Sequence, residues 1–254
     1  MPRLDEATAV RYNRDGPLEN RFRGLGIGAG AGAGGIIDTY FAEESLYSQE
    51  SYDDVPFETV EGVWPNYAGI GLSHQIAQAT DGFNDMPTSI ENRYLRIRTS
   101  NDHASLIPPG AENLKNVEVL ARMAVTSTTH NSLALRVRGT GDPGNPGGYG
   151  LLYHSTNLRL VSWGNGENNT SLVSDLSADS VGSKVWVWGK LRIIDDLISA
   201  KAWLGNLEEE PATWEAEDIV NNDWPDAGSV SFGTSIPPSG SVSHFLDYIK
   251  VSPL

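Results

Sequence analysis

Short runs in which apolar and polar residues alternate dominate the second half of the chain. In the stretch RYLRIRTS, Leu95 and Ile97 fall on one side and the arginines fall on the other. This period of two is typical of a half-buried β-strand. The next run repeats the alternation through Val117, Val119 and Ala121. Further runs of this kind occupy residues 132–139, 149–155, 158–164, 185–194, 197–205, 229–235 and 243–252.

Turn-forming residues, and not helices, link these runs. The interval 139–150, GTGDPGNPGGYG, is so dense in glycine and proline that we expect an exposed loop. Asp195 and Asp196 separate two runs and predict a hairpin turn. Residues 73–83, SHQIAQATDGF, have the composition of a helix of one or two turns. Nine or more strands without crossover helices predict an all-β chain folded as an antiparallel β-sandwich or jelly roll.

The N-terminal part of the chain has a different composition. Residues 24–35 are almost entirely glycine and alanine, and they predict a tether that is flexible or closely packed against neighbours. Gly30, Gly32 and Gly35 match the dinucleotide-binding pattern G-x-G-x-x-G. Because no apolar strand precedes them, the match is weak evidence for a nucleotide-binding site. We therefore expect an arm over residues 1–23, a tether over 24–35 and a sandwich domain over 36–254.

The arm differs from the rest of the chain in charge. It carries five arginines against four acids, a net charge of +1, which leaves −16 for the rest of a chain whose net charge is −15. Such an acidic body disfavours nucleic acid and anionic membrane as main partners. A near-neutral arm on an acidic body suggests docking onto an acidic neighbour, including another copy of the chain. The residues expected to act in assembly are Arg3, Arg11, Arg14, Arg21, Arg23, Gly28, Gly30 and Gly32.

The chain also lacks several common features. It has no cysteine, so disulfides cannot stabilise it. No apolar run is long enough to span a membrane, and the first residues do not read as a secretion leader. Neither insertion into a membrane nor export is therefore expected.

The C-terminal third resembles a known family of folds. The elements that carry the resemblance are Trp186 or Trp188, residues 191–194, Lys201 to Trp203, Glu210 to Trp214, Gly228 to Phe232 and Phe245 to Val251. In this order they look like the end of a concanavalin A-like lectin or glucanase sandwich of the laminin-G kind. The resemblance implies the sandwich fold, and it leaves the function open because one fold serves many functions.

Glycoside hydrolysis is the enzymatic hypothesis that such a fold raises. It requires two carboxylates flanking the scissile bond, which glucanases of this superfamily supply with an E-x-D-x-x-E motif. The chain contains no such motif. Glu210, Glu215 and Glu217 are the candidates that remain, and their position around Pro211 is more typical of solvated loop acids. We therefore predict no catalytic residues.

Metal and cofactor sites are also weakly indicated. The five histidines are scattered, without a spacing that would place two of them on one face for zinc. Members of the superfamily often bind calcium through loop carboxylates, and Asp142, Asp175 and Asp179 lie in expected loops. We predict no cofactor and leave calcium open.

Aromatic residues offer a binding hypothesis. Tyr149 and Tyr153 lie beside the glycine- and proline-rich interval, and Trp163 precedes GNGENN. Exposed rings near loops can stack on sugars, so these three residues are the candidates for glycan binding. The alternative is that the rings fill the core of the sandwich.

The combination of features resembles a structural protein of a tailed-bacteriophage virion. Such proteins assemble in the host cytoplasm and commonly attach by an extended arm while displaying a sandwich. The resemblance implies a non-enzymatic structural or attachment component of the head, tail or baseplate, forming a homo-oligomer with other virion proteins as partners. The alternatives are a module that binds host surface glycan, which is compatible with the virion role, and a glycoside hydrolase.

Overall fold

The structure is a computed structural model, and it describes the chain in segments. The described residues are 35–40, 47–51, 57–59, 62–64, 66–67, 72–78, 93–100, 105–108, 110–126, 132–139, 147–154, 157–164, 169–176, 181–235 and 241–254. The predicted arm and nearly all of the tether, including all eight of the expected assembly residues, lie outside them.

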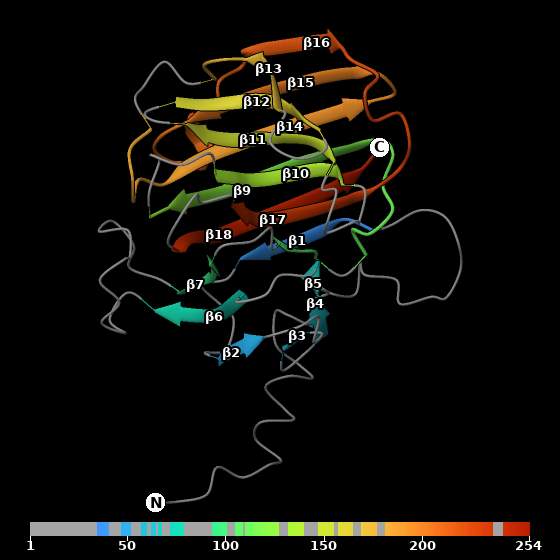
Figure 1. Cartoon of the computed structure of the whole chain (residues 1–254). Helices are drawn as coiled ribbons and strands as arrows, with labels where there is room; N and C mark the ends of the chain where they lie inside the picture. Colours follow the sequence, from blue (N-terminus) through green and yellow to red (C-terminus); the bar gives the residue numbers. More distant parts are fainter. Residues whose placement is uncertain are drawn as a thin grey trace, which may run out of the picture.

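The described strands form two large antiparallel sheets and one small hairpin (Figure 1). The larger sheet has nine strands in the order β16–β15–β14–β9–β18–β7–β6–β2, and β1 also pairs with β18. Their bounds are β1 Ile37–Tyr40, β2 Tyr47–Ser51, β6 Leu72–Gln78, β7 Arg93–Ser100, β9 Val117–Val125, β14 Val187–Ile194, β15 Leu197–Trp203, β16 Ala216–Val220 and β18 Ser241–Pro253.

The smaller sheet has seven strands in the order β13–β12–β11–β10–β17–β8–β5. Their bounds are β5 Asn66–Tyr67, β8 Ser105–Leu106, β10 Ser132–Gly139, β11 Gly148–His154, β12 Asn157–Trp163, β13 Asn169–Val173 and β17 Ser229–Ser235. The separate hairpin pairs β3 Phe57–Thr59 with β4 Gly62–Trp64. The antiparallel sandwich expected from the alternating runs is thus confirmed, and every one of those runs contains a strand.

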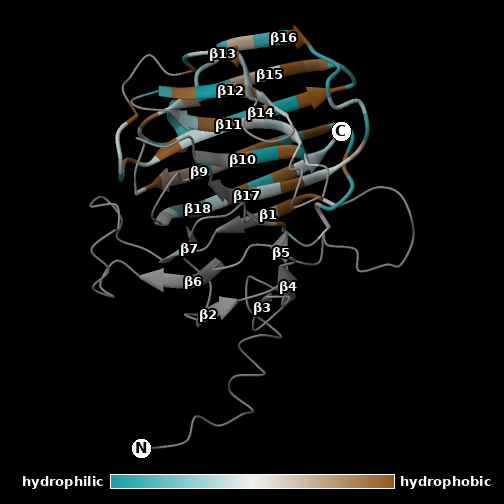
Figure 2. Cartoon of the chain, viewed as in Figure 1, coloured by the Kyte–Doolittle hydropathy of each residue, from teal (hydrophilic) through white to brown (hydrophobic). Residues whose placement is uncertain are grey.

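The inner faces of the two sheets meet in one apolar core. On β9, Val117, Val119 and Ala121 point inward and are fully buried, as the alternation predicted. They share the core with Leu151 of β11 and Phe232 of β17, which come from the opposite sheet. Figure 2 shows hydrophobic and hydrophilic residues alternating along strands of both sheets. Every second residue of these strands is therefore excluded from the core and can serve another purpose.

Two local predictions have different outcomes. Asp195 and Asp196 form the turn of the β14–β15 hairpin, as expected, and Asp195 adopts the left-handed conformation with φ of 52°. The short helix that the composition of residues 73–83 allowed is absent from their described part, because residues 72–78 form strand β6. This strand pairs with β7 on one side and with β2 on the other, so sheet hydrogen bonding prevails over a weak helical preference.

The buried side chain of Arg138 joins three segments at one end of the sandwich. It is 2% exposed, and its guanidinium donates hydrogen bonds to three backbone carbonyls. The acceptors are the carbonyls of Lys115 at 2.8 Å, Trp224 at 2.9 Å and Asp195 at 2.6 Å. The fixed fork of the guanidinium suits this geometry, whereas a single ammonium cannot reach all three directions.

We expect Arg138→Lys to lower the free energy of unfolding by about 2–4 kcal/mol, because buried carbonyls lose their donors. Urea unfolding followed by tryptophan fluorescence measures this effect. Arg159→Lys, at a half-buried position of β12, is the control and should change stability by less than about 1 kcal/mol. Equal stability of the two variants would contradict the conclusion that Arg138 stabilises the fold by joining these three segments.

Candidate functional site

The aromatic residues predicted to bind glycan are buried in the structure. Tyr149 and Tyr153 are both 0% exposed and belong to the core between the sheets. The Tyr149 hydroxyl donates to Asn221 and accepts a hydrogen bond from the backbone N–H of Trp224 at 3.1 Å. The Tyr153 hydroxyl donates to the carbonyl of Met123 at 3.1 Å. Both rings are therefore engaged in packing and in fixing neighbouring backbone.

Trp163 occupies a separate cluster on the smaller sheet. It is 1% exposed and packs with Leu152 and Val161. None of the three predicted rings presents a face to solvent, so their burial argues against the sugar platform expected from the sequence. It favours the alternative, in which these rings fill the sandwich.

The outer face of the larger sheet has a more ordered arrangement of side chains. The register of β15, β14, β9 and β18 aligns outward residues in rows across the four strands. The aromatic row consists of Trp203, Trp188, Arg122 and Tyr248. The lysine row consists of Lys201, Lys190, Leu120 and Lys250. The polar row consists of Ser199, Arg192, Glu118 and Ser252.

The aromatic row is a packed layer above the sheet. The rings of Trp188 and Trp203 are stacked with centroids 6.0 Å apart, and Tyr248 meets Trp188 edge-on at 5.6 Å. Arg122 lies over the Trp188 ring at 5.9 Å, and its guanidinium donates to the carboxylate of Asp247 at 2.8 Å. Ring stacking and the cation–π contact stabilise one arrangement of this row.

Two carboxylates hold part of the lysine row. Glu210 accepts from Lys190 at 3.0 Å and from Lys201 at 2.7 Å, while Glu118 lies 3.2 Å from Lys190. Burial alone would lower the pKa of Lys190, but its bonds to Glu210 and Glu118 raise that pKa above its ordinary value. Burial would likewise raise the pKa of Glu210, and its bonds to Lys201 and Lys190 lower it instead. Lys190 and Glu210 are therefore both charged at neutral pH.

Residues 204–215, which we call the cover loop, lie over these rows. The indoles of Trp188 and Trp203 donate to the carbonyls of Gly205 and Asn206 at 3.1 and 3.0 Å. The loop continues through the short 3₁₀ helix η2, Leu207–Glu209, to Glu210 on the lysine row. Further along, the Trp214 ring covers the guanidinium of Arg192 at 4.6 Å and the Lys201 ammonium at 4.9 Å. The sheet thus fixes the loop along its length.

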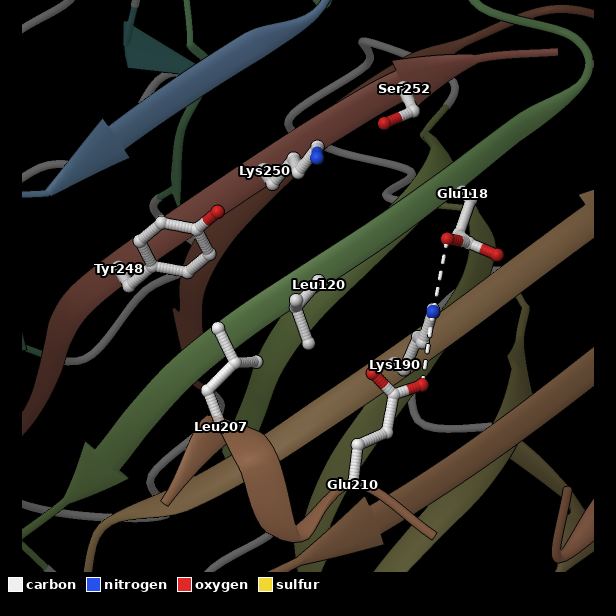
Figure 3. A pocket seen from close by; sticks show the side chains of 8 residues that line it. All are labelled: Glu118, Leu120, Lys190, Leu207, Glu210, Tyr248, Lys250 and Ser252. Atoms are coloured by element: carbon white, nitrogen blue, oxygen red, sulfur yellow. Dashed lines mark hydrogen bonds and ion pairs between the residues drawn. The ribbon is translucent and has the colours of Figure 1, made fainter. Parts of the chain in front are cut away.

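A groove of about 290 Å³ lies between the cover loop and β18 (Figure 3). The residues that line it are Glu118, Leu120, Lys190, Leu207, Glu210, Tyr248, Lys250 and Ser252. Figure 3 shows Tyr248 and Lys250 on one side, Leu207 and Glu210 on the other, and Leu120 between them. The groove therefore combines apolar surface with charged hydrogen-bonding groups, the combination found in ligand sites.

The three acids considered for glycoside hydrolysis have different surroundings. Glu210 is held by two lysines, which differs from the solvated loop acid expected. Glu215 accepts a hydrogen bond from the backbone N–H of Ala202 at 3.3 Å, and partial burial, with the charge of Asp175, raises its pKa to about 7. Glu217 lies on β16 and is exposed, so its placement in a loop was wrong.

The described residues show no metal cluster or membrane-spanning helix. No group of three His, Asp or Glu side chains is placed to hold a metal ion in this part of the chain. Of the expected calcium ligands, Asp142 and Asp179 lie outside the described residues, and Asp175 lies at the start of the segment after β13. The calcium hypothesis stays a prediction. Within the same ranges, no helix is long and apolar enough to cross a membrane.

Sequence reasoning missed the groove because its residues are spread over more than 130 positions of the chain. A weak signal was present, since the chain has only five lysines and three of them, Lys190, Lys201 and Lys250, occupy polar positions of alternating runs. The register that brings these three into one row is a property of the folded sheet.

Comparisons with known proteins give partial similarities of fold. No protein-family model matches the sequence, and no curated protein matches it. Cellulose-induced protein Cip1 has a TM-score of 0.49 at 13% identity, over 75% of this chain and 91% of that chain. The exoplasmic/lumenal domain of VIP36, bound to Ca²⁺ and Man2, has a TM-score of 0.42 at 17% identity, over 66% and 79% of the two chains. A family 7 alginate lyase in complex with product has a TM-score of 0.44 at 9% identity, over 63% and 79%. At these TM-scores the likeness says nothing about what the groove holds.

We expect Glu210→Gln to loosen the cover loop, because its ion pairs with Lys190 and Lys201 are lost. The pairs are partly exposed, so the effect is about 1 kcal/mol, or roughly a fivefold faster amide hydrogen exchange over residues 204–215 at neutral pH. The folded-state pKa of Glu210 lies below its ordinary value of 4.5. Its stabilisation is therefore present above about pH 4.5 and is lost as the pH falls through the folded pKa.

The exchange rates of the wild-type and variant loops should accordingly converge under acidic conditions. Glu208→Gln removes an equal charge from an exposed position of the same loop and is the matched control. If both variants exchange at the wild-type rate at neutral pH, Glu210 does not anchor the loop.

Proposed function

We propose that the chain is a non-enzymatic glycan-binding protein whose ligand lies in the groove on the outer face of the larger sheet. The observation that carries the proposal is the groove of about 290 Å³ in which Tyr248 and Leu120 lie beside charged residues. A sugar has apolar C–H faces and a rim of hydroxyl groups. Apolar side chains and an aromatic ring can contact the C–H faces of the sugar, while carboxylates and ammonium groups can form hydrogen bonds with its hydroxyl groups.

The rigidity of the surroundings supports binding in this groove. Tyr248 is held by Trp188, and the opposite wall is held by hydrogen bonds from two indoles and by Glu210. A wall that is already ordered loses little conformational entropy when a ligand arrives. The carboxylates that line the groove are both paired with Lys190, so they act here as binding and anchoring groups and not as a free acid and base.

The wider role that we propose is attachment within a tailed-bacteriophage virion, with the arm as the assembly element. One structural feature supports it. Strand β1 begins two residues after the tether and pairs with β18 through Ile37 and Val251, so the first described strand of the chain joins the larger sheet beside a central strand. Ile36 is 53% exposed at this point. Assembly in the host cytoplasm and contact with other virion proteins belong to the same proposal.

We expect Leu207→Trp to weaken glycan binding at least tenfold, because a larger side chain at this wall fills the groove. Leu207 is 37% exposed, so the substitution should leave stability nearly unchanged. Affinity gel electrophoresis of the full chain against a panel of soluble polysaccharides measures binding. Val220→Trp, at a 69% exposed apolar position of edge strand β16, is the matched control and should bind as the wild type does. Unchanged binding by Leu207→Trp would place the ligand elsewhere.

The assembly role predicts a difference in mass between two forms of the protein. By sedimentation, the full chain should be a defined oligomer, while a chain that begins at Ile36 and keeps every described strand should be a folded monomer. Two monomers of equal stability would contradict assembly through the arm and leave glycan binding untouched.

A further inference from the structure

We infer that the groove is built for an acidic polysaccharide, one whose sugars carry carboxylate or sulfate groups. This inference rests on the proposed function and adds the chemical class of the ligand. The starting observation is the distribution of charge. The chain has a net charge of −15, yet the aromatic, lysine and polar rows together hold five cations, Arg122, Lys190, Arg192, Lys201 and Lys250. Four of them form ion pairs with acids of these rows or of neighbouring positions, namely Asp247, Glu118, Glu210 and Asp218. Lys250 is the fifth.

An acidic protein repels anions at long range, so an anionic ligand is attracted only where a cation stands at short range from it. Three of the chain's five lysines stand in the lysine row, across four strands whose neighbours lie about 4.8 Å apart. Glu210 already pairs with two of them, Lys190 and Lys201, whereas Lys250 lines the groove, so an anionic group on a sugar can meet Lys250 there. A neutral polymer lacks this contact.

The cover loop already shows that the lysine row binds a carboxylate. Glu210 reaches down from the loop and accepts hydrogen bonds from both Lys190 and Lys201. Those bonds hold the pKa of Glu210 below its ordinary value despite burial, as expected for a carboxylate in a favourable cationic site. One half of the row is thus occupied by a carboxylate of the protein itself.

Lys250 occupies the other half of the row, where the described residues offer it no such partner. It lines the groove beside Tyr248 and Leu120, and it is half-buried. Among the side chains that the structure describes, no carboxylate forms an ion pair with it, and Asp38, its cross-strand neighbour on β1, is not among those side chains. A ligand carboxylate or sulfate that enters the groove can therefore make a charge-assisted hydrogen bond to Lys250 without displacing a protein group. Tyr248 lines the groove beside Lys250 and is 8% exposed, so a small part of its side chain can contact the sugar that carries this anion.

The test compares polymers with the same backbone and different charge, using the full chain. Polygalacturonate is compared with its methyl ester, and dextran sulfate is compared with dextran. We expect the full chain to bind at least one charged polymer tenfold or more tightly than its neutral counterpart, with the affinity falling as NaCl is raised from low to high concentration. The two pairs distinguish a carboxylate ligand from a sulfate ligand.

Lys250→Gln should lower the affinity for the charged polymer at least tenfold and leave the weak binding of the neutral polymer unchanged. Lys115→Gln removes the same charge from an exposed position before β9 and is the matched control. Nonspecific attraction of a polyanion would be weakened equally by both variants, and this outcome overturns the inference.

The remaining outcomes separate this inference from the proposed function. If charged and neutral polymers bind equally and Leu207→Trp abolishes both, the groove holds a glycan whose charge is irrelevant, so the inference fails and the proposed function stands. If neither the four polymers nor the wider polysaccharide panel binds, the proposed function fails as well.

Discussion

The packing of β9, β14 and β18 against the smaller sheet is the constraint on which the rest of the structure depends. The inward positions of these strands are apolar, so burial of Val119, Leu191 and Ile249 fixes which residues face the core. A slip of one residue would turn each apolar set outward and expose it to water. The free energy that this exposure would cost fixes the register of β9, β14 and β18, and of β15, which pairs with β14. The register in turn decides which outward side chains stand beside one another.

The outer face of the larger sheet follows from this constraint. With the register fixed, Trp188 and Trp203 stack, and the same pairing places Lys190 beside Lys201 one row further along. The two indoles then supply donors for the start of the cover loop, while the two lysines supply partners for Glu210. The groove is the space left between this loop and β18. Core burial, loop position and groove chemistry are therefore successive consequences of one alternation.

The sequence allowed the strands to be predicted, because alternation and turn residues are local signals. The Asp195–Asp196 turn is such a case. The helix that composition allowed over the region of β6 is absent there because the two sheet neighbours of β6, which local composition does not report, decide its conformation. Ring burial depends on packing in the same way, and Tyr149 could be a platform or a core residue until the structure placed it in the core. The groove was unpredictable for a similar reason, since Leu120 and Lys250 become neighbours only through the pairing of β9 with β18.

The location of a bound sugar is the central claim, and amide chemical shifts measure it most directly. Uniformly ¹⁵N-labelled full chain would be titrated with a short oligogalacturonide and its amide spectrum followed. The account predicts that the perturbed amides cluster on β9, β14, β18 and the cover loop, around Leu120, Lys190 and Lys250. Perturbations that cluster instead around Tyr149 and Trp163, with the cover loop unchanged, would contradict it and return the site to the loops beside the smaller sheet.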